Sequence, residues 1–197
     1  MKFSKYVILP LIFVFLIADA GGQPRKTKQT AKIKEQNSFS SESKVSNAVK
    51  LPSNILRQLA EYDDGQLANC QRDRFLRRSN AAKHFAASAI KLNADQQSDL
   101  VVQAQTPCFM GAHNTIFWIF ARSNRNAANY NLKFELAADF LEILSSSTKG
   151  FRDLETASHT AVELYTIKWK FDGEKYQQSE CTVTDENDKT AKVECQP

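Results

Sequence analysis

The chain has 197 residues, a length typical of one domain, and a formal net charge of +4 at pH 7. It contains six Gly and no glycine-rich loop of the kind that cradles phosphate, which argues against nucleotide-binding enzymes. It has no C-x-x-C pair and its three His are scattered along the sequence, so we expect no metal centre and no cofactor.

The first 20 residues have the pattern of a secretory signal peptide. Lys2 and Lys5 precede an almost wholly apolar run over 6–17, and Ala18-Asp19-Ala20 then offers a cleavage site. That run is shorter than the roughly 20 residues that cross a bilayer, although an uncleaved anchor is the alternative. We therefore expect a periplasmic or secreted protein with no transmembrane segment after cleavage.

Residues 21–50 predict a disordered basic tether. They hold seven Lys or Arg and two Glu, with isolated apolar residues such as Phe39 and Val45. Their charge allows weak, salt-sensitive contact with anionic surfaces, while a plain solvated linker is the alternative. No aromatic residues are interleaved with the lysines, so nucleic acid is not an expected partner. The remaining 51–197 carry 17 basic and 19 acidic residues and predict a single disulfide-stapled domain.

The periodicity of 51–197 predicts an α+β fold, mainly an antiparallel β meander with one or two N-terminal helices. Residues 51–62 predict a helix, since Ile55 and Leu59 share one face and Pro52 suits the first turn. Strands are expected at 86–90, 100–105, 115–120, 130–136, 162–171 and from Tyr176, with 140–144 a strand or short helix. A loop is expected at 145–150 and a polar connector at 151–159. The run at 115–120 is apolar on both faces, which is typical of a central or doubly covered strand.

Four cysteines are present, and an exported chain with an even number is expected to pair them. Three connectivities are possible. Two short alternating segments lie between Cys181 and Cys195, and a hairpin there would bring the two thiols together. We therefore predict a Cys181–Cys195 bond, which leaves Cys70 to pair with Cys108.

Asn93, Asp95 and Asp99 lie between two apolar runs, in the sequence KLNADQQSDLVV. This stretch resembles the strand-loop-strand of FG-GAP and VCBS-type repeats, in which alternating oxygen ligands bind Ca²⁺. Lys91 replaces the first acidic ligand and Gln96 replaces the turn glycine. The stretch is therefore interpreted as a degenerate repeat whose metal site is lost, or as a plain polar turn.

Three further motifs follow in order: CFMGAHN from Cys108, GFRDL from Gly150 and FDGEKY from Phe171. Together with the preceding stretch they resemble a group of small exported bacterial proteins of uncharacterised function. The resemblance implies an exported, sheet-rich domain and carries no activity.

The function predicted from these features is an exported cell-envelope binding domain without catalysis, with an unknown envelope protein or glycan as partner. Its candidate binding loop contains Gly111, His113 and Asn114, because binding residues are often placed on loops. The alternative is a hydrolase inhibitor that inserts 107–114 into a target cleft, or a small hydrolase. No G-x-S-x-G elbow is present, and paired cysteines leave no free thiol nucleophile. A calcium-dependent adhesion module is a third hypothesis.

Overall fold

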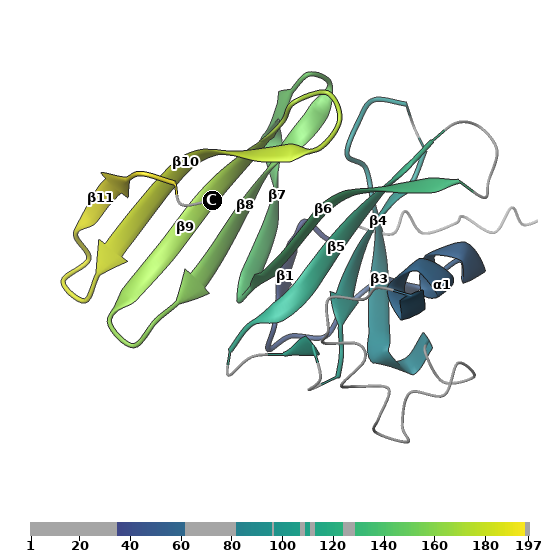
Figure 1. Cartoon of the computed structure of the whole chain (residues 1–197), viewed down its shortest axis with the longest axis horizontal. Coiled ribbons are helices and arrows are strands. Elements are labelled where there is room, and N and C mark those ends of the chain that lie inside the picture. The colour runs from purple at the N-terminus through teal and green to yellow at the C-terminus, as the bar shows by residue number, and fades with distance from the viewer. Residues whose placement is uncertain are drawn as a thin grey trace, which may run out of the picture. The chain divides into compact units, whose positions relative to one another are not determined.

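The computed structural model describes residues 35–61, 82–95, 97–106, 109–110, 113–123 and 129–195. Residues Ile33–Pro197 form one compact unit. Its described part contains one α-helix, α1 (Ser53–Glu61), and eleven strands in two antiparallel sheets (Figure 1). This confirms the predicted α+β class with a dominant antiparallel sheet. No helix in the described part is both long and apolar enough to cross a membrane.

The strands divide into a larger sheet of six and a smaller sheet of five. The larger sheet has the order β1 (Ser38–Ser40), β7 (Phe140–Thr148), β8 (Phe151–His159), β9 (Glu163–Phe171), β10 (Tyr176–Asp185) and β11 (Thr190–Val193). The smaller sheet has the order β2 (Ala48–Val49), β3 (Phe85–Ile90), β4 (Asp99–Ala104), β5 (Thr115–Arg122) and β6 (Tyr130–Ala138). Consecutive strands pair within β3–β6 and within β7–β11, which is the predicted meander. The division into two sheets was not predicted.

Two apolar layers hold these elements together. Phe117 and Ile119 of β5 contribute to the layer between the two sheets, while Trp118 and Phe120 contribute to the layer that includes α1. Successive side chains of a strand point to opposite faces, so β5 is buried on both of them. The uninterrupted apolar run in the sequence therefore predicted its burial on both faces correctly.

The predictions of a loop at 145–150 and a connector at 151–159 are wrong. β7 continues to Thr148, and β8 is a central strand that pairs with both β7 and β9. The turn between β7 and β8 is made by Lys149 and Gly150, whose φ angles are 50° and 83°. The chain thus reverses within two residues, where a six-residue loop was expected.

The polar composition of β8 explains why its sequence was misinterpreted. Thr156 is buried on its inner face, where its hydroxyl accepts a hydrogen bond of 2.9 Å from the indole N–H of Trp169. Leu154, two residues earlier, is fully buried on the same face. A buried polar group that finds a partner costs little, so a strand can bury threonine where the sequence suggests an exposed segment.

The second half of the predicted tether also differs from the expectation, because residues 35–50 belong to the folded unit. Phe39 lies in β1, is 1 % exposed, and joins the core between the sheets together with Val45. β1 pairs with β7 in antiparallel register. The two apolar residues that are isolated in the sequence thus supply an edge strand and part of the core. The folded domain begins before residue 51; the leader and residues 21–34 lie outside the described part.

Arg152 joins this N-terminal segment to the larger sheet. Its guanidinium donates to the carbonyl oxygens of Ile143 and Leu144, each at 2.7 Å, where β7 departs from regular pairing. It also donates to the carboxylate of Glu35 at 3.1 Å and to the side-chain oxygen of Asn37 at 3.2 Å. Arginine suits this place because its planar group presents several donors in a fixed geometry.

The Arg152→Lys variant is expected to lower the free energy of unfolding by about 2–3 kcal/mol, because lysine keeps the charge but cannot satisfy all of these acceptors. Urea unfolding followed by circular dichroism measures the change. Arg57→Lys, at an exposed position of α1, is the matched control and should change stability little. Equal stability of the two variants would contradict a linking role for Arg152.

Candidate functional site

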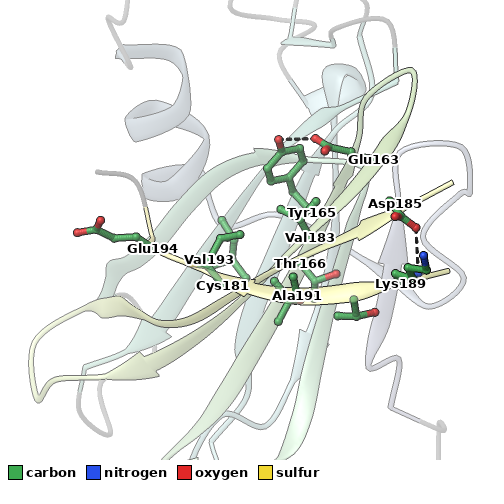
Figure 2. Close-up of a pocket in the computed structure, with 13 residues that line it drawn as sticks. Glu163, Tyr165, Thr166, Cys181, Val183, Asp185, Lys189, Ala191, Val193 and Glu194 are labelled. Carbon is green, nitrogen blue, oxygen red and sulfur yellow. Dashed lines mark hydrogen bonds between the residues drawn. The ribbon is translucent and has the colours of Figure 1, made fainter. Parts of the chain in front are cut away.

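A hollow of about 650 Å³ lies on one face of β9, β10 and β11 (Figure 2). Strand pairing arranges its floor in two apolar rows that cross the three strands. The rows are Ile167, Cys181 and Val193, and Tyr165, Val183 and Ala191. We call this surface the open ledge.

The open ledge continues the face of the larger sheet that packs on the smaller sheet. Trp169, Ile167 and Tyr165 alternate along β9 and therefore lie on one face. Trp169 belongs to the core between the sheets and is 7 % exposed, whereas Tyr165 is 39 % exposed. The smaller sheet thus covers this face at Trp169 and leaves it uncovered at Tyr165, four residues earlier in β9.

The rim of the open ledge is acidic. Three carboxylate residues, Glu163, Asp185 and Glu194, line it together with one cation, Lys189. Glu163 accepts a hydrogen bond of 2.6 Å from the Tyr165 hydroxyl, and this bond raises the pKa of the Tyr165 phenol. Formal charges at the rim therefore sum to −2 at neutral pH, which favours cationic groups beside an apolar floor.

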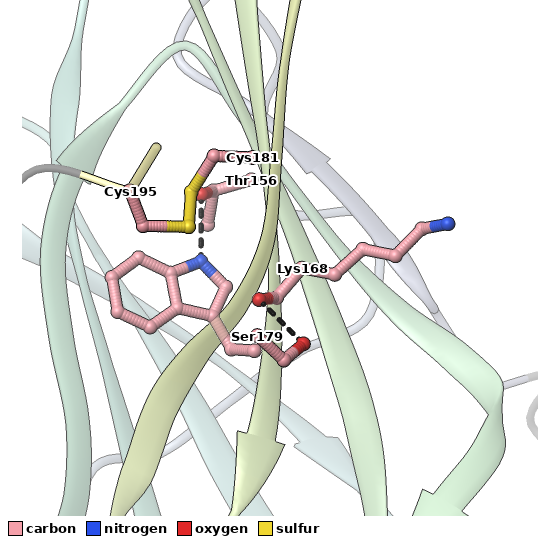
Figure 3. The surroundings of a disulfide bond; sticks show 6 residues. Thr156, Lys168, Ser179, Cys181 and Cys195 are labelled. Atoms are coloured by element: carbon pink, nitrogen blue, oxygen red, sulfur yellow. Dashed lines mark hydrogen bonds between the residues drawn. A yellow bond between two sulfur atoms is a disulfide. The ribbon is translucent and has the colours of Figure 1, made fainter. Parts of the chain in front are cut away.

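The predicted disulfide Cys181–Cys195 is present and closes one end of the open ledge, with its Cα atoms 5.3 Å apart (Figure 3). It ties the residues that follow β11 back to β10. Thr156, which accepts the Trp169 indole bond, lies beside the disulfide. A cross-link of this kind stabilises a fold by about 2–4 kcal/mol, so the outermost hairpin is held in place although little covers it. Cys70 and Cys108 lie outside the described residues.

The predicted binding loop contributes one residue to a second, separate hollow. His113 is exposed and lines a space of about 330 Å³ together with Glu42, Asp139, Phe140 and His159. Asn114 is half-buried, and Gly111 lies outside the described residues. The structure thus brings two of the three histidines of the sequence to one hollow, which their separation in the sequence does not reveal.

Asp139 and His159 form a hydrogen-bonded pair in this second hollow. The buried Asp139 carboxylate accepts from the backbone N–H of His159 at 2.7 Å and lies 2.9 Å from its Nδ1. A carboxylate that orients an imidazole is found in hydrolases, but such a site also needs a nucleophile. The hydroxyl of Thr160 is engaged in the β8–β9 turn, where it bonds Val162 and Glu163. Because the backbone N–H of His159 bonds the same carboxylate, the pair also holds the end of β8 beside that turn.

The stretch that resembles a calcium loop, with Asn93, Asp95 and Asp99, is held as a turn by hydrogen bonds from backbone N–H groups. Both carboxylate oxygens of the fully buried Asp99 accept backbone N–H groups, from Leu92 at 3.0 Å and from Arg122 at 2.9 Å. Asn93 and Asp95 each accept a backbone N–H two residues further along the chain. The three oxygen-bearing side chains therefore bond the protein itself. Across the described ranges, no group of three His, Cys, Asp or Glu residues is arranged to hold a metal.

Comparison of the chain with protein-family models, with curated proteins and with solved structures found no match. The candidate site therefore rests on the geometry of this chain. Sequence reasoning predicted the strand at 162–171 but missed Tyr165 and Val183 as surface residues. The alternation of this strand from Ile167 onward indicated one apolar face, but it did not indicate how far that face would be covered.

Calcium at millimolar concentration is expected to leave the melting temperature of the protein unchanged, because both oxygens of Asp99 are already used by backbone N–H groups. Differential scanning calorimetry with and without calcium measures this, and magnesium serves as the ionic-strength control. A calcium-specific rise in melting temperature would restore the hypothesis of a calcium-dependent module.

Asp99 is also expected to make stability depend on pH. Burial raises the pKa of its carboxyl, in spite of the backbone N–H groups of Arg122 and Leu92 that lower it. The folded state then binds this proton more tightly than the unfolded chain, whose aspartate pKa is about 3.9. The contribution of Asp99 to the free energy of unfolding is therefore greatest below that value and declines as pH rises through the raised folded-state pKa.

Urea unfolding over a pH series measures this decline as the difference between the wild type and Asp99→Asn. The difference should shrink as pH rises, while the variant loses about 1–3 kcal/mol overall because its amide cannot accept both N–H groups. Asp188→Asn, an exposed turn position, is the matched control. A difference that is constant across the pH series would contradict the raised pKa.

Proposed function

We propose that this chain is an exported, non-enzymatic binding domain of the cell envelope, and that its open ledge takes a basic, amphipathic segment of a partner protein. Export is supported by the basic and apolar leader pattern of residues 1–20 and by the Cys181–Cys195 disulfide, a bond typical of oxidising compartments.

The observation that carries the proposal is the uncovered apolar floor. Tyr165 and Val193 are 39 % and 40 % exposed, and they lie on a face that is otherwise core. Exposed apolar surface that is contiguous and rimmed by polar groups is a feature of interaction sites. A segment that places apolar side chains on the two rows would remove this surface from water, with a gain of roughly 25 cal/mol for each Å² buried.

The acidic rim supports a basic partner. Glu163 and Asp185 stand directly across from each other as paired residues of β9 and β10, in the row beside that of Tyr165 and Val183. A cationic side chain beside the apolar anchors would meet both carboxylates, which favours lysine or arginine in the partner and selects against acidic segments. A glycan offers less apolar surface to these rows, so a protein segment fits them better.

The alternative of a hydrolase inhibitor has less support. Its predicted inserting loop, 107–114, contributes His113 to the second hollow, but four of its residues lie outside the described part. The Asp139–His159 pair is the observation that favours a small hydrolase, and the use of the Thr160 hydroxyl in the turn weighs against it.

The binding proposal is tested with two nine-residue peptides that alternate valine with lysine or valine with glutamate. Isothermal titration calorimetry is expected to detect the lysine peptide with wild-type protein and not the glutamate peptide. Tyr165→Lys should weaken binding of the lysine peptide at least about tenfold, because it places a charge among the apolar rows.

Val162→Lys is the matched control, since it makes the same kind of change at a 59 % exposed apolar residue in the β8–β9 turn, away from the ledge floor. It should bind the lysine peptide like the wild type. The same variants would be used as baits in an envelope extract, where the partner should be lost with Tyr165→Lys alone. Equal binding by both variants, or preference for the glutamate peptide, would rule out the open ledge as the site.

A further inference from the structure

β11 forms one edge of the larger sheet, and its four residues are all exposed. On the inner face, its residues Ala191 and Val193 carry the two apolar rows of the open ledge to this edge. Val193 is 40 % exposed there. The apolar rows therefore reach the edge of the sheet at Ala191 and Val193.

The backbone pattern shows which groups face outward from β11. Asp185 donates its backbone N–H to the carbonyl of Lys189, so these two residues form a hydrogen-bonded pair. Such pairs alternate along an antiparallel ladder, which makes Ala191 and Val193 the next residues that bond β10. The N–H and C=O groups of Lys192 and Glu194 then point away from β10, where another strand could pair with them.

A row of alternating charges ends at the same edge, on the outer face. Glu155 pairs with Lys168, and Lys168 pairs in turn with Glu180. Glu180 then contacts Lys192 of β11 diagonally, because the direct β10 partner of Lys192 is Thr182. The carboxylate and ammonium are 2.9 Å apart, and this bond lowers the pKa of the Glu180 carboxyl. Lys192 is 80 % exposed. The next position of the row, beyond β11, calls for an acidic residue.

We propose that a second copy of this chain occupies this edge, with the two β11 strands antiparallel across a two-fold axis that places Val193 opposite the partner's Val193. In this register Lys192 stands opposite the partner's Glu194, and the partner's Lys192 stands opposite Glu194. The charge row gains its missing acidic residue, and the apolar row is continued by the partner's Val193.

Charge selects this register among those that keep the apolar residues on one face. If the two-fold axis passes instead between the two copies of Lys192, this residue lies directly opposite the partner's Lys192. Like charges in that position destabilise a sheet. A further shift places Ala191 opposite the partner's Ala191, and then Val193 meets the partner's Lys189. The register centred on Val193 alone combines apolar contact with two ion pairs.

The dimer extends the proposed function, and its functional meaning rests on the proposal that the open ledge binds a partner segment. The two open ledges would join across the two-fold axis into one continuous apolar floor, so each ledge would be incomplete without the partner's Val193. A pairing of two short edge strands buries a small area, and such contacts are typical of weak, reversible complexes. The dimer is therefore expected to form over a concentration range that sedimentation can follow.

The test is sedimentation equilibrium of the full chain, expressed with its leader so that the cell processes it and forms the disulfide, from about 1 μM to about 1 mM. The wild type is expected to dimerise reversibly. Glu194→Lys should weaken the dimer about tenfold or more, because each of the two Lys192–Glu194 ion pairs across the axis becomes a pair of like charges. The double variant Lys192→Glu with Glu194→Lys should restore the wild-type constant to within about threefold.

Glu186→Lys, in the exposed β10–β11 turn, makes the same charge change outside the register and should dimerise like the wild type. A chain that is monomeric at every concentration, or a double variant that stays as weak as Glu194→Lys, would overturn the proposal. Peptide titration of the wild type separates the two proposals. A wild-type chain that stays monomeric and binds the lysine peptide overturns the dimer alone, and a wild-type dimer that ignores the peptide overturns the binding function alone.

Discussion

The contact of Phe134 with the larger sheet decides where the two sheets are closed and where they are open. The Phe134 ring, on edge strand β6, lies 5.0 Å from the Trp169 ring and 6.0 Å from the Tyr176 ring, in edge-on geometry. β6 is the last strand of the smaller sheet, so the cover over the larger sheet stops there. The remaining inner face of β9 to β11 is left as the open ledge, which is the surface on which both functional proposals depend.

An uncovered apolar face is a liability unless the strands beneath it are fixed. Here the disulfide, the Trp169–Thr156 bond and the charge row of the outer face all act on β9, β10 and β11. The disulfide and the Trp169–Thr156 bond act at the covered end of the inner face, and the charge row acts on the solvent side. The exposed part of the inner face is left available. An edge strand is also prone to pair with other chains, and the single lysine of β11 limits the registers that are favourable.

Polar groups attach the periphery to this sandwich in addition to the apolar contacts of Phe39 and Val45. Arg152 bonds β7 to residues 35 and 37, and buried Asp99 holds the turn between β3 and β4 against the end of β5. Each satisfies backbone or side-chain groups that would otherwise lose their partners on burial. Buried acids such as Asp99 therefore serve the architecture, although their spacing in the sequence resembles that of metal ligands.

The sequence by itself determined the elements whose information is local. Alternation specified most strands, the apolar run specified a doubly buried β5, and the hairpin pattern specified the Cys181–Cys195 bond. Only the tertiary structure decided that polar β8 is central, that Phe39 completes the core, that His113 and His159 line one hollow, and that Tyr165 is exposed while Trp169 is buried. These outcomes depend on which face another sheet covers, and periodicity reports that a strand has an apolar face without reporting what packs on it.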